Sequence, residues 1–430
     1  MRALSLTLAG VCLLAVNAAA VDRYVNATNP SPVAPFIAWG NAARTIQDAV
    51  DVSVAGDVIW VAAGTYSNGG RVMVGSMTNR VAVTVPVTVR SVSGPAVTVI
   101  AGVADPSWSF VLGCGSSAVR CVYLTNGASL IGFTLTNGNT LTTGDIQKER
   151  SAGGVYCEDN SVTISNCVIV NCGGYQAAGG GAAGTYRNCI IKNNKAWNGG
   201  GVYVGVLQDC TVAGNWAGSE GAGLFSCIVQ RCTVVSNTCG STGGGMTACW
   251  ADRCLIQGNS ASQVGGGCSR GSVSNSLVIQ NAAPGWRGGG GYQTEFVNCT
   301  LVANTAPDSG GAFTSVLINC IAYYNTGTTV NANIDPLSSV TYSCVPGMAG
   351  AGNISAAPQF LAGSYRLQPS SPCIDKGTNL PSLLAAKDLD GRPRIEGSNV
   401  DMGAYEFGGS AVNDYNANGQ SDFPVFNPAD

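Results

Sequence analysis

Residues 199–215 read GGGVYVGVLQDCTVAGN and contain one unit of a repeat that runs through the middle of the chain. A glycine cluster opens the unit, a cysteine follows, and an asparagine comes five residues after the cysteine. The cysteine position returns every 21 to 23 residues, once as serine, at Cys167, Cys189, Cys210, Cys232, Cys254, Ser276, Cys299 and Cys320. The asparagine returns at Asn194, Asn215, Asn237, Asn259, Asn281, Asn304 and Asn325, while Cys172 stands in the first unit. A fixed period of this length is the signature of a solenoid, in which each unit buries its apolar face against the next.

Each unit contains short apolar runs of three to five residues, separated by turn residues. Such runs are too short for helices, so we expect an all-β chain wound as a parallel β-helix with about 22 residues per coil. Coils stacked about 4.8 Å apart place equivalent residues in ladders along the axis. We expect the cysteines to point inward as small apolar groups. We expect the asparagines to occupy left-handed bends and to hydrogen-bond to one another along the axis.

The N-terminus has the features of a secretory signal peptide. Arg2 carries the positive charge, Leu4 to Val16 form a short apolar core, and Ala18-Ala19-Ala20 offers a small-residue cleavage site. The core is shorter than the roughly 20 residues that span a membrane, and an uncleaved anchor is the alternative. Further along, Thr45 to Val54 has helical spacing and predicts a short capping helix.

The repeat fades after Asn325, which predicts a separate module at the C-terminal end of the helix. We expect a signal peptide over residues 1–20, an N-terminal cap and first coils over 21–80, the parallel β-helix over 81–345, a small closing module over 346–407, and a linker with a partial calcium loop over 408–430.

Composition excludes several classes of function. The net charge is −3 and only 10% of the residues are charged, so the chain lacks the basic stripe that nucleic-acid binding requires. The sequence contains no histidine. Its absence removes Ser-His-Asp and Cys-His catalysis and histidine-ligated zinc.

The repeats, with Gly-Gly-Gly-Val and a recurring asparagine, resemble right-handed parallel β-helix proteins of bacterial surfaces, including polymorphic outer-membrane proteins. The N-terminal segment, from Thr45-Ile46-Gln47-Asp48-Ala49 to Gly64-Thr65-Tyr66, is similar to the start of pectin-lyase-like helices. Residues 371–407 resemble the choice-of-anchor tail that often follows such helices. The resemblance implies a single-stranded right-handed parallel β-helix and a bacterial protein that is secreted or attached to the cell surface or outer membrane.

A metal-binding pattern lies near the C-terminal end of the sequence. Oxygen-bearing side chains alternate around Gly419, with a further carboxylate at the end, at Asp414, Asn416, Asn418, Gln420 and Asp422. This spacing is typical of a loop that wraps a hard cation, and we expect calcium as the cofactor. Val425 stands where an EF-hand has glutamate, so the loop is not an EF-hand. The alternative is a solvated turn without metal.

The cysteines allow two interpretations. Buried free thiols would form a ladder inside the coils, because parallel Cβ vectors hold stacked sulfurs too far apart for easy bonding. Disulfides are the alternative in an oxidising compartment, with Cys114–Cys121 and Cys227–Cys249 as the best candidate pairs.

A column of candidate ligand-binding residues lies seven positions before the anchors. It contains Tyr203, Phe225, Tyr292 and Phe313, with Thr247 and Ser269 between them, and Trp197 and Trp286 occupy nearby turns. Residues just before the column have an inward register, so we expect the column to face solvent. Exposed rings at a regular spacing suit the stacking of sugars, and the alternative is ordinary packing between coils.

Charge is densest in the insertion Asp145 to Arg150, where Lys148 and Arg150 are weak catalytic candidates. β-Helix lyases use lysine or arginine as the base, and the resemblance extends this possibility to Lys192, Lys195 and Asp209. The alternative is a solvated loop. We therefore expect a non-catalytic adhesive, glycan-binding or envelope-structural protein with polysaccharide partners, no nucleic acid and no membrane span after signal cleavage. The alternative is a polysaccharide lyase or glycoside hydrolase acting on a uronic-acid polymer.

Overall fold

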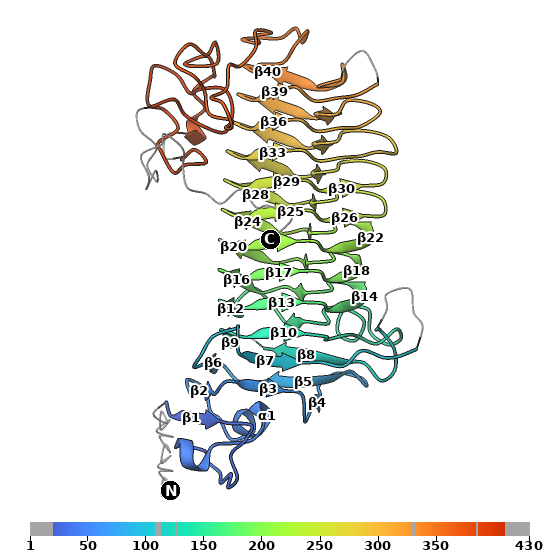
Figure 1. The fold of residues 1–430 in the computed structure, drawn as a ribbon, viewed down its shortest axis with the longest axis vertical. Helices are drawn as coiled ribbons and strands as arrows, with labels where there is room; N and C mark the ends of the chain where they lie inside the picture. The colour runs from blue at the N-terminus through green and yellow to red at the C-terminus, as the bar shows by residue number, and fades with distance from the viewer. Residues whose placement is uncertain (1–19, 108–112, 126, 329–331, 384–385, 409–430) are drawn as a thin grey trace, which may run out of the picture.

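The computed structural model describes residues 20–107, 113–125, 127–328, 332–383 and 386–408. Coils are stacked in one tall column, with the N-terminal cap at one end and a C-terminal module against the side of the other (Figure 1). The described strands form four sheets, and all strand pairs but one are parallel. The predicted all-β, right-handed parallel β-helix is confirmed.

Sheet A has thirteen strands, β1 (Asp22–Val25), β2 (Val58–Val61), β6 (Thr88–Ser91), β9 (Ser129–Ile131), β12 (Thr163–Ser165), β16 (Thr185–Arg187), β20 (Val206–Gln208), β24 (Ile228–Gln230), β28 (Trp250–Asp252), β32 (Ser272–Ser274), β35 (Glu295–Val297), β38 (Val316–Ile318) and β40 (Ser339–Thr341). Sheet B has eleven, β3 (Gly64–Tyr66), β7 (Thr98–Ala101), β10 (Thr134–Thr136), β13 (Val168–Val170), β17 (Ile190–Lys192), β21 (Thr211–Ala213), β25 (Thr233–Val235), β29 (Leu255–Gln257), β33 (Leu277–Ile279), β36 (Thr300–Val302) and β39 (Ile321–Tyr323).

Sheet C also has eleven strands, β4 (Arg71–Val72), β5 (Thr78–Val83), β8 (Val119–Leu124), β11 (Val155–Cys157), β15 (Gly181–Ala182), β19 (Val202–Tyr203), β23 (Leu224–Phe225), β27 (Met246–Thr247), β31 (Cys268–Ser269), β34 (Gly291–Tyr292) and β37 (Ala312–Phe313). Sheet D is short, with β14 (Gly173–Ala177), β18 (Lys195–Asn198), β22 (Trp216–Glu220), β26 (Thr238–Cys239) and β30 (Ser260–Ala261). A middle coil visits the sheets in the order A, B, D and C before it rises to the next coil.

Left-handed residues form the corners of each coil. Asn188, Asn193 and Asp209 have φ of 51°, 56° and 55°, and each directly precedes a residue whose side chain is buried in the helix. Our expectation that the ladder asparagines themselves occupy the left-handed bend is wrong. The bend lies one residue earlier, and the ladder residue turns inward immediately after it.

The predicted asparagine ladder is confirmed. Within it, Asn237 Oδ1 accepts hydrogen bonds from the backbone N–H of Asn215 at 2.9 Å and from its Nδ2 at 3.0 Å. The same arrangement continues from Asn194 to Asn325. Each corner leaves one N–H outside the strand ladder, and the asparagine of the next coil satisfies it. A buried N–H without a partner would be costly, so the recurring residue type follows from the geometry.

The cysteine ladder works in the same way. The backbone N–H of Cys210 donates to Cys232 Sγ at 3.3 Å, and the N–H of Cys254 donates to Ser276 Oγ at 2.9 Å, which explains why serine can replace the thiol. The seventeen described cysteines are buried and free. Neither candidate disulfide is formed, and Cys249 Sγ instead accepts the backbone N–H of Cys227 at 3.3 Å.

The predicted capping helix is α1 (Ile46–Asp51), which begins after Thr45, whose side chain accepts the N–H of Asp48. It lies under the first coils beside the short 3-10 helix η1 (Trp39–Asn41). Gln47 bonds both the N–H and the carbonyl of Ala82, at 2.7 and 3.1 Å. The side chain thereby pairs backbone groups of β5 that would otherwise lie open at the end of the sheet.

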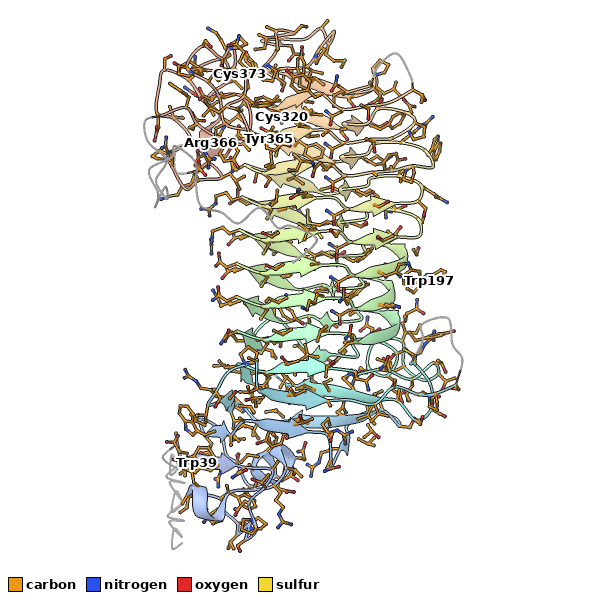
Figure 2. The ribbon with its side chains drawn as sticks, in the orientation of Figure 1. Trp39, Trp197, Cys320, Tyr365, Arg366 and Cys373 are labelled. Atoms are coloured by element: carbon orange, nitrogen blue, oxygen red, sulfur yellow. The ribbon has the colours of Figure 1, made fainter. Side chains whose placement is uncertain are left out.

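The residues after β40 form few regular elements, among them the 3-10 helix η2 (Pro381–Leu383), and pack on the outer face of sheet B. Leu277, Ile279 and Val302 lie under this module, at outward positions of sheet B that carry both polar residues (Lys192, Thr211, Thr233) and apolar ones (Ile190, Val235) in lower coils. Tyr365 and Arg366, labelled in Figure 2, lie on the module near this contact. The module therefore covers apolar outward side chains of the upper coils.

Two expected segments lie outside the described residues, namely most of the signal peptide and the calcium loop at Asp414 to Asp422. Over the residues that are described, no helix is long and apolar enough to span a membrane.

Candidate functional site

A polar hollow of about 440 Å³ lies where sheets B and D meet in the lower coils. Residues 104–107 and Gly113 form its wall. They lie between Val103 and Val119, which pair through two backbone hydrogen bonds. Its floor is the corner that follows sheet B. The hollow therefore exists because one loop projects beyond the regular outline of the coils.

Three exposed asparagines form the floor of the hollow. Asn137, Asn171 and Asn193 each follow a sheet B strand in register, and each has a left-handed backbone with φ between 55° and 57°. Among the described residues, the side-chain amides of Asn171 and Asn193 have no hydrogen-bond partner. Neighbouring coils lie about 4.8 Å apart, so the amides form a row of donors and acceptors facing the hollow.

Asp105 is the carboxylate that lines the hollow, and its oxygens are already engaged. It accepts hydrogen bonds from the side chain and backbone of Ser107, and from the backbone and hydroxyl of Ser117 at 2.7 and 2.8 Å. These bonds, led by that of the Ser107 hydroxyl, hold the pKa of Asp105 well below its usual range. The carboxylate fixes the projecting loop and is a poor proton acceptor at neutral pH.

Lys195 supplies a positive charge at the edge of the hollow. It is exposed and starts β18, where it pairs in register between Gly173 and Trp216. No described carboxylate forms an ion pair with it. Its ammonium group is therefore available to an anionic ligand in the hollow.

Aromatic rings continue from the hollow across sheet D. Trp197 is 40% exposed and lies two residues after Lys195, at the outer edge of these strands (Figure 2). Trp216 is half-buried beside Lys195 in the next coil. In the coil below, the guanidinium carbon of Arg150 lies 5.2 Å from the centre of the Tyr175 ring. We call Tyr175, Lys195, Trp197, Trp216 and Arg150 the aromatic strip.

The charged insertion is a tightly bonded loop. Arg120, which is fully buried, donates to the carbonyls of Lys148 and Ser151 at 2.6 and 2.8 Å and stacks on Tyr156 at 5.2 Å. Glu149 accepts the N–H of Ser76 at 2.8 Å. The loop directs Arg150 to sheet D, where it bonds Gln176, whereas the bonds of Lys148 are made by its backbone. Of the two catalytic candidates, only Arg150 reaches the aromatic strip, and neither lines the hollow.

The predicted column lies in register on sheet C, next to the inward Val202, Leu224 and Met246. Its rings stack in pairs, Tyr203 on Phe225 at 5.1 Å and Tyr292 on Phe313 at 6.1 Å. Thr247 and Ser269, which stand between the two pairs, are buried, and so is Phe313.

Trp286 and Phe313 both contact Arg287, whose guanidinium lies 4.4 and 4.3 Å from their rings. The column is thus two separate ring pairs rather than the continuous exposed platform we expected, because the two positions between the pairs carry Thr247 and Ser269, which have no ring and are buried. Of the remaining candidates, Lys192 is exposed on sheet B outside the hollow, and Asp209 pairs with Arg231 at 2.7 Å.

Sequence reasoning missed the three corner asparagines and Tyr175. Their signal was present: the position before the ladder residue is asparagine in the first coils and Gly214, Ser236 or Gly258 in later ones. An alignment of the units shows this change, but it does not show that a loop from residues 104–107 covers the same corner.

No known family model matches the chain, and no curated protein matches it significantly. Among solved structures, the chain is similar to "pectate lyase Pel9A" (14% identity, TM-score 0.48, covering 90% of this chain and 96% of that one). It is also similar to "XylC with xylose" (9%, 0.42, 90% and 99%) and to "rhamnogalacturonan lyase" (14%, 0.36, 75% and 87%). At these identities and scores, the matches carry no argument about the activity of this chain.

Proposed function

We propose that this protein is a secreted or cell-surface β-helix that binds an acidic polysaccharide without cleaving it. The site is the polar hollow together with the aromatic strip. The observation that supports this most is the pairing of a free cation, Lys195, with a row of unpaired amides at Asn171 and Asn193.

Each part of the site suits one feature of a uronic-acid chain. Lys195 would pair with a sugar carboxylate, and the amides would exchange hydrogen bonds with hydroxyl groups. Trp197 and Trp216 would stack on the apolar faces of adjacent sugars. The strands that carry these side chains belong to continuous sheets, so the site is largely formed before a ligand arrives.

We propose binding without cleavage because the described residues of the site lack the groups that proton transfer requires. Polysaccharide hydrolysis requires two carboxyl groups in defined roles, and elimination requires a base within hydrogen-bond reach of the sugar. Among the described lining residues, Asp105 is the carboxylate, and its hydrogen bonds occupy both oxygens. The site is therefore better suited to binding a polysaccharide chain than to cleaving it.

A lyase is the second candidate function, because Lys195 stands in the hollow where a base would be needed. Cleavage would then proceed by elimination: Lys195 would accept the proton from the carbon next to the uronate carboxyl group, the glycosidic C–O bond on the adjacent ring carbon would break, and the departing oxygen would take a proton from water. In that case, unsaturated products would accumulate.

The test combines binding and turnover on the full chain. Affinity electrophoresis in gels containing alginate, polygalacturonate or a neutral glucan should show retention by the acidic polymers only. Lys195→Ala should weaken this retention about tenfold, since it removes a charge-assisted contact. Lys192→Ala is the matched control, because Lys192 is exposed on the same coil but outside the hollow.

Equal effects of the two variants, or no retention by any acidic polymer, would refute the proposal. Unsaturated products that disappear in Lys195→Ala would establish the lyase instead.

We also propose that the segment from Asp414 to Asp422 binds calcium and that the N-terminal segment directs secretion in a bacterium. The alternation of oxygen ligands supports the first, and the charged, apolar and small-residue regions support the second.

A further inference from the structure

A second surface with different chemistry lies on sheet A. Trp250 is 62% exposed there, and Ile228 beside it is 48% exposed. Val206, Ile228 and Trp250 are paired in register on β20, β24 and β28, so they form one apolar row along the helix axis. The row ends on both sides, because Thr185 and Ser272 occupy the next positions.

Polar side chains run parallel to the apolar row. Gln208, Gln230 and Asp252 are the outward residues two positions later on the same strands. Gln208 Nε2 donates to Gln230 Oε1 at 3.3 Å. Gln230 keeps its own amide hydrogens for a ligand, since no described group accepts from them. The surface therefore offers a ring face with hydrogen-bonding groups directly beside it.

Both carboxylates near the row are paired within the protein, and the exposed Arg187 on the neighbouring strand donates to Gln208 Oε1. Asp252 accepts from Arg253 at 3.0 Å and from Asn275 at 2.7 Å, and Asp209 pairs with Arg231 at 2.7 Å. In the polar hollow, Lys195 itself lines the site, whereas Val206, Ile228, Trp250 and the two glutamines beside them carry no charge. A ligand stacked along this row therefore needs no charge of its own.

The size of the row argues against a protein partner. Three coils span about 14 Å along the axis, and polar residues bound the row at both ends. Stable protein interfaces bury about 800 Å² on each partner around an apolar centre, far more than three side chains provide. A single extended chain of sugars needs only a narrow track of this kind.

We propose that Trp250, with Gln230 and Gln208, forms a second binding site that takes an uncharged polysaccharide lying along the helix axis. One sugar stacks on the Trp250 ring, and the glutamine amides bond its hydroxyl groups. Sheets A and D lie on opposite sides of the column (Figure 1), with β24 and β28 on one side and β18 and β22 on the other. One molecule would thus bridge a neutral and an acidic chain.

The experiment is affinity electrophoresis of the full chain in gels containing β-linked glucan, xylan or mannan. At least one neutral polymer should retain the protein, and Trp250→Ala should weaken that retention about tenfold. Gln230→Ala should weaken it less. Trp39→Ala is the matched control, because Trp39 (Figure 2) is 44% exposed on η1 of the N-terminal cap and its loss should leave retention unchanged. Circular dichroism should show that every variant is folded, as expected for exposed positions.

Three outcomes would overturn the proposal. They are no retention by any neutral polymer, equal retention of wild type and Trp250→Ala, and a concentration-dependent dimer in sedimentation that Trp250→Ala abolishes. The last would show that a second copy of the chain covers the row. Retention by acidic polymers and its loss in Lys195→Ala are measured separately, so failure of one site does not decide the other.

Discussion

Replacing Asn237 by alanine should test the idea that the ladder satisfies corner N–H groups. Asn237 is fully buried, and its side chain makes four hydrogen bonds with residues of adjacent coils. Its Oδ1 accepts from the N–H and Nδ2 of Asn215, and its Nδ2 donates to Val212 O at 3.0 Å and to Asn259 Oδ1 at 2.9 Å. Alanine removes all four.

The expected cost follows from what remains. The N–H of Asn215 and the carbonyl of Val212 lose these bonds in a dry interior, and each unsatisfied group costs about 1–3 kcal/mol. Together with the lost side-chain packing, we expect the free energy of unfolding to fall by about 3–5 kcal/mol. The exposed neighbour Thr238 is the control, and Thr238→Ala should change it by less than about 0.5 kcal/mol.

Asn237→Asp adds a pH signature, because it keeps the shape of the side chain. Burial raises the pKa of an aspartate above its unfolded value of about 3.9. The stability of this variant should therefore be greatest below about pH 4 and should fall as pH rises.

Urea unfolding followed by circular dichroism measures the free energy, and hydrogen exchange at the Asn215 amide measures the local effect. A loss below about 1 kcal/mol in Asn237→Ala, or unchanged protection of Asn215, would refute the account.

Four further predictions address other parts of the molecule. Gly244→Ala should destabilise the helix in urea by about 2–3 kcal/mol, because its Cβ would lie within about 2.5 Å of two carbonyl oxygens; a neutral effect would contradict this close approach. Arg120→Met should release the insertion, so that trypsin cuts after Lys148 faster than in wild type; an unchanged rate would show that Arg120 does not hold it. Burial raises the pKa of Glu406 to about 9, above its ordinary value of 4.5, so its contribution to stability is present below about pH 4.5 and is lost as pH rises toward 9. Glu406→Gln should flatten this dependence in thermal melts recorded across that range, and an unaltered slope would exclude the role. Asp414→Ala should abolish calcium binding in isothermal titration of the full chain, and equal heats for variant and wild type would exclude the loop.

The ladders could be predicted from the repeat, because few residue types can occupy a buried position whose side chain must accept the N–H of a neighbouring corner. The corner residues were harder to place. Left-handed backbone is carried by Asn193 in one coil and by Gln280, Ala303 or Tyr324 in others, so no residue type marks the bend. Because the next side chain must point into the helix, the residue before it takes the left-handed backbone whatever its type.

The candidate site was visible only in fragments. Lys195 and Trp197 stood out as a charge and a ring in a polar coil, and Arg150 as part of an insertion. Their proximity depends on sheet D, a feature that short polar runs with many glycines did not indicate. Trp250 was missed for a different reason: one exposed ring on a strand leaves no periodic signal.

The sequence by itself determined the solenoid, its period and the inward cysteine and asparagine ladders, because these depend on contacts between equivalent residues of adjacent units. Only the tertiary structure decided where the loop from residues 104–107 lies, which outward positions the C-terminal module covers, and which rings remain exposed. Those features join segments far apart in the chain or lie on outer faces. At solvent-exposed positions many residue types are tolerated, so the repeat does not determine which residue stands there.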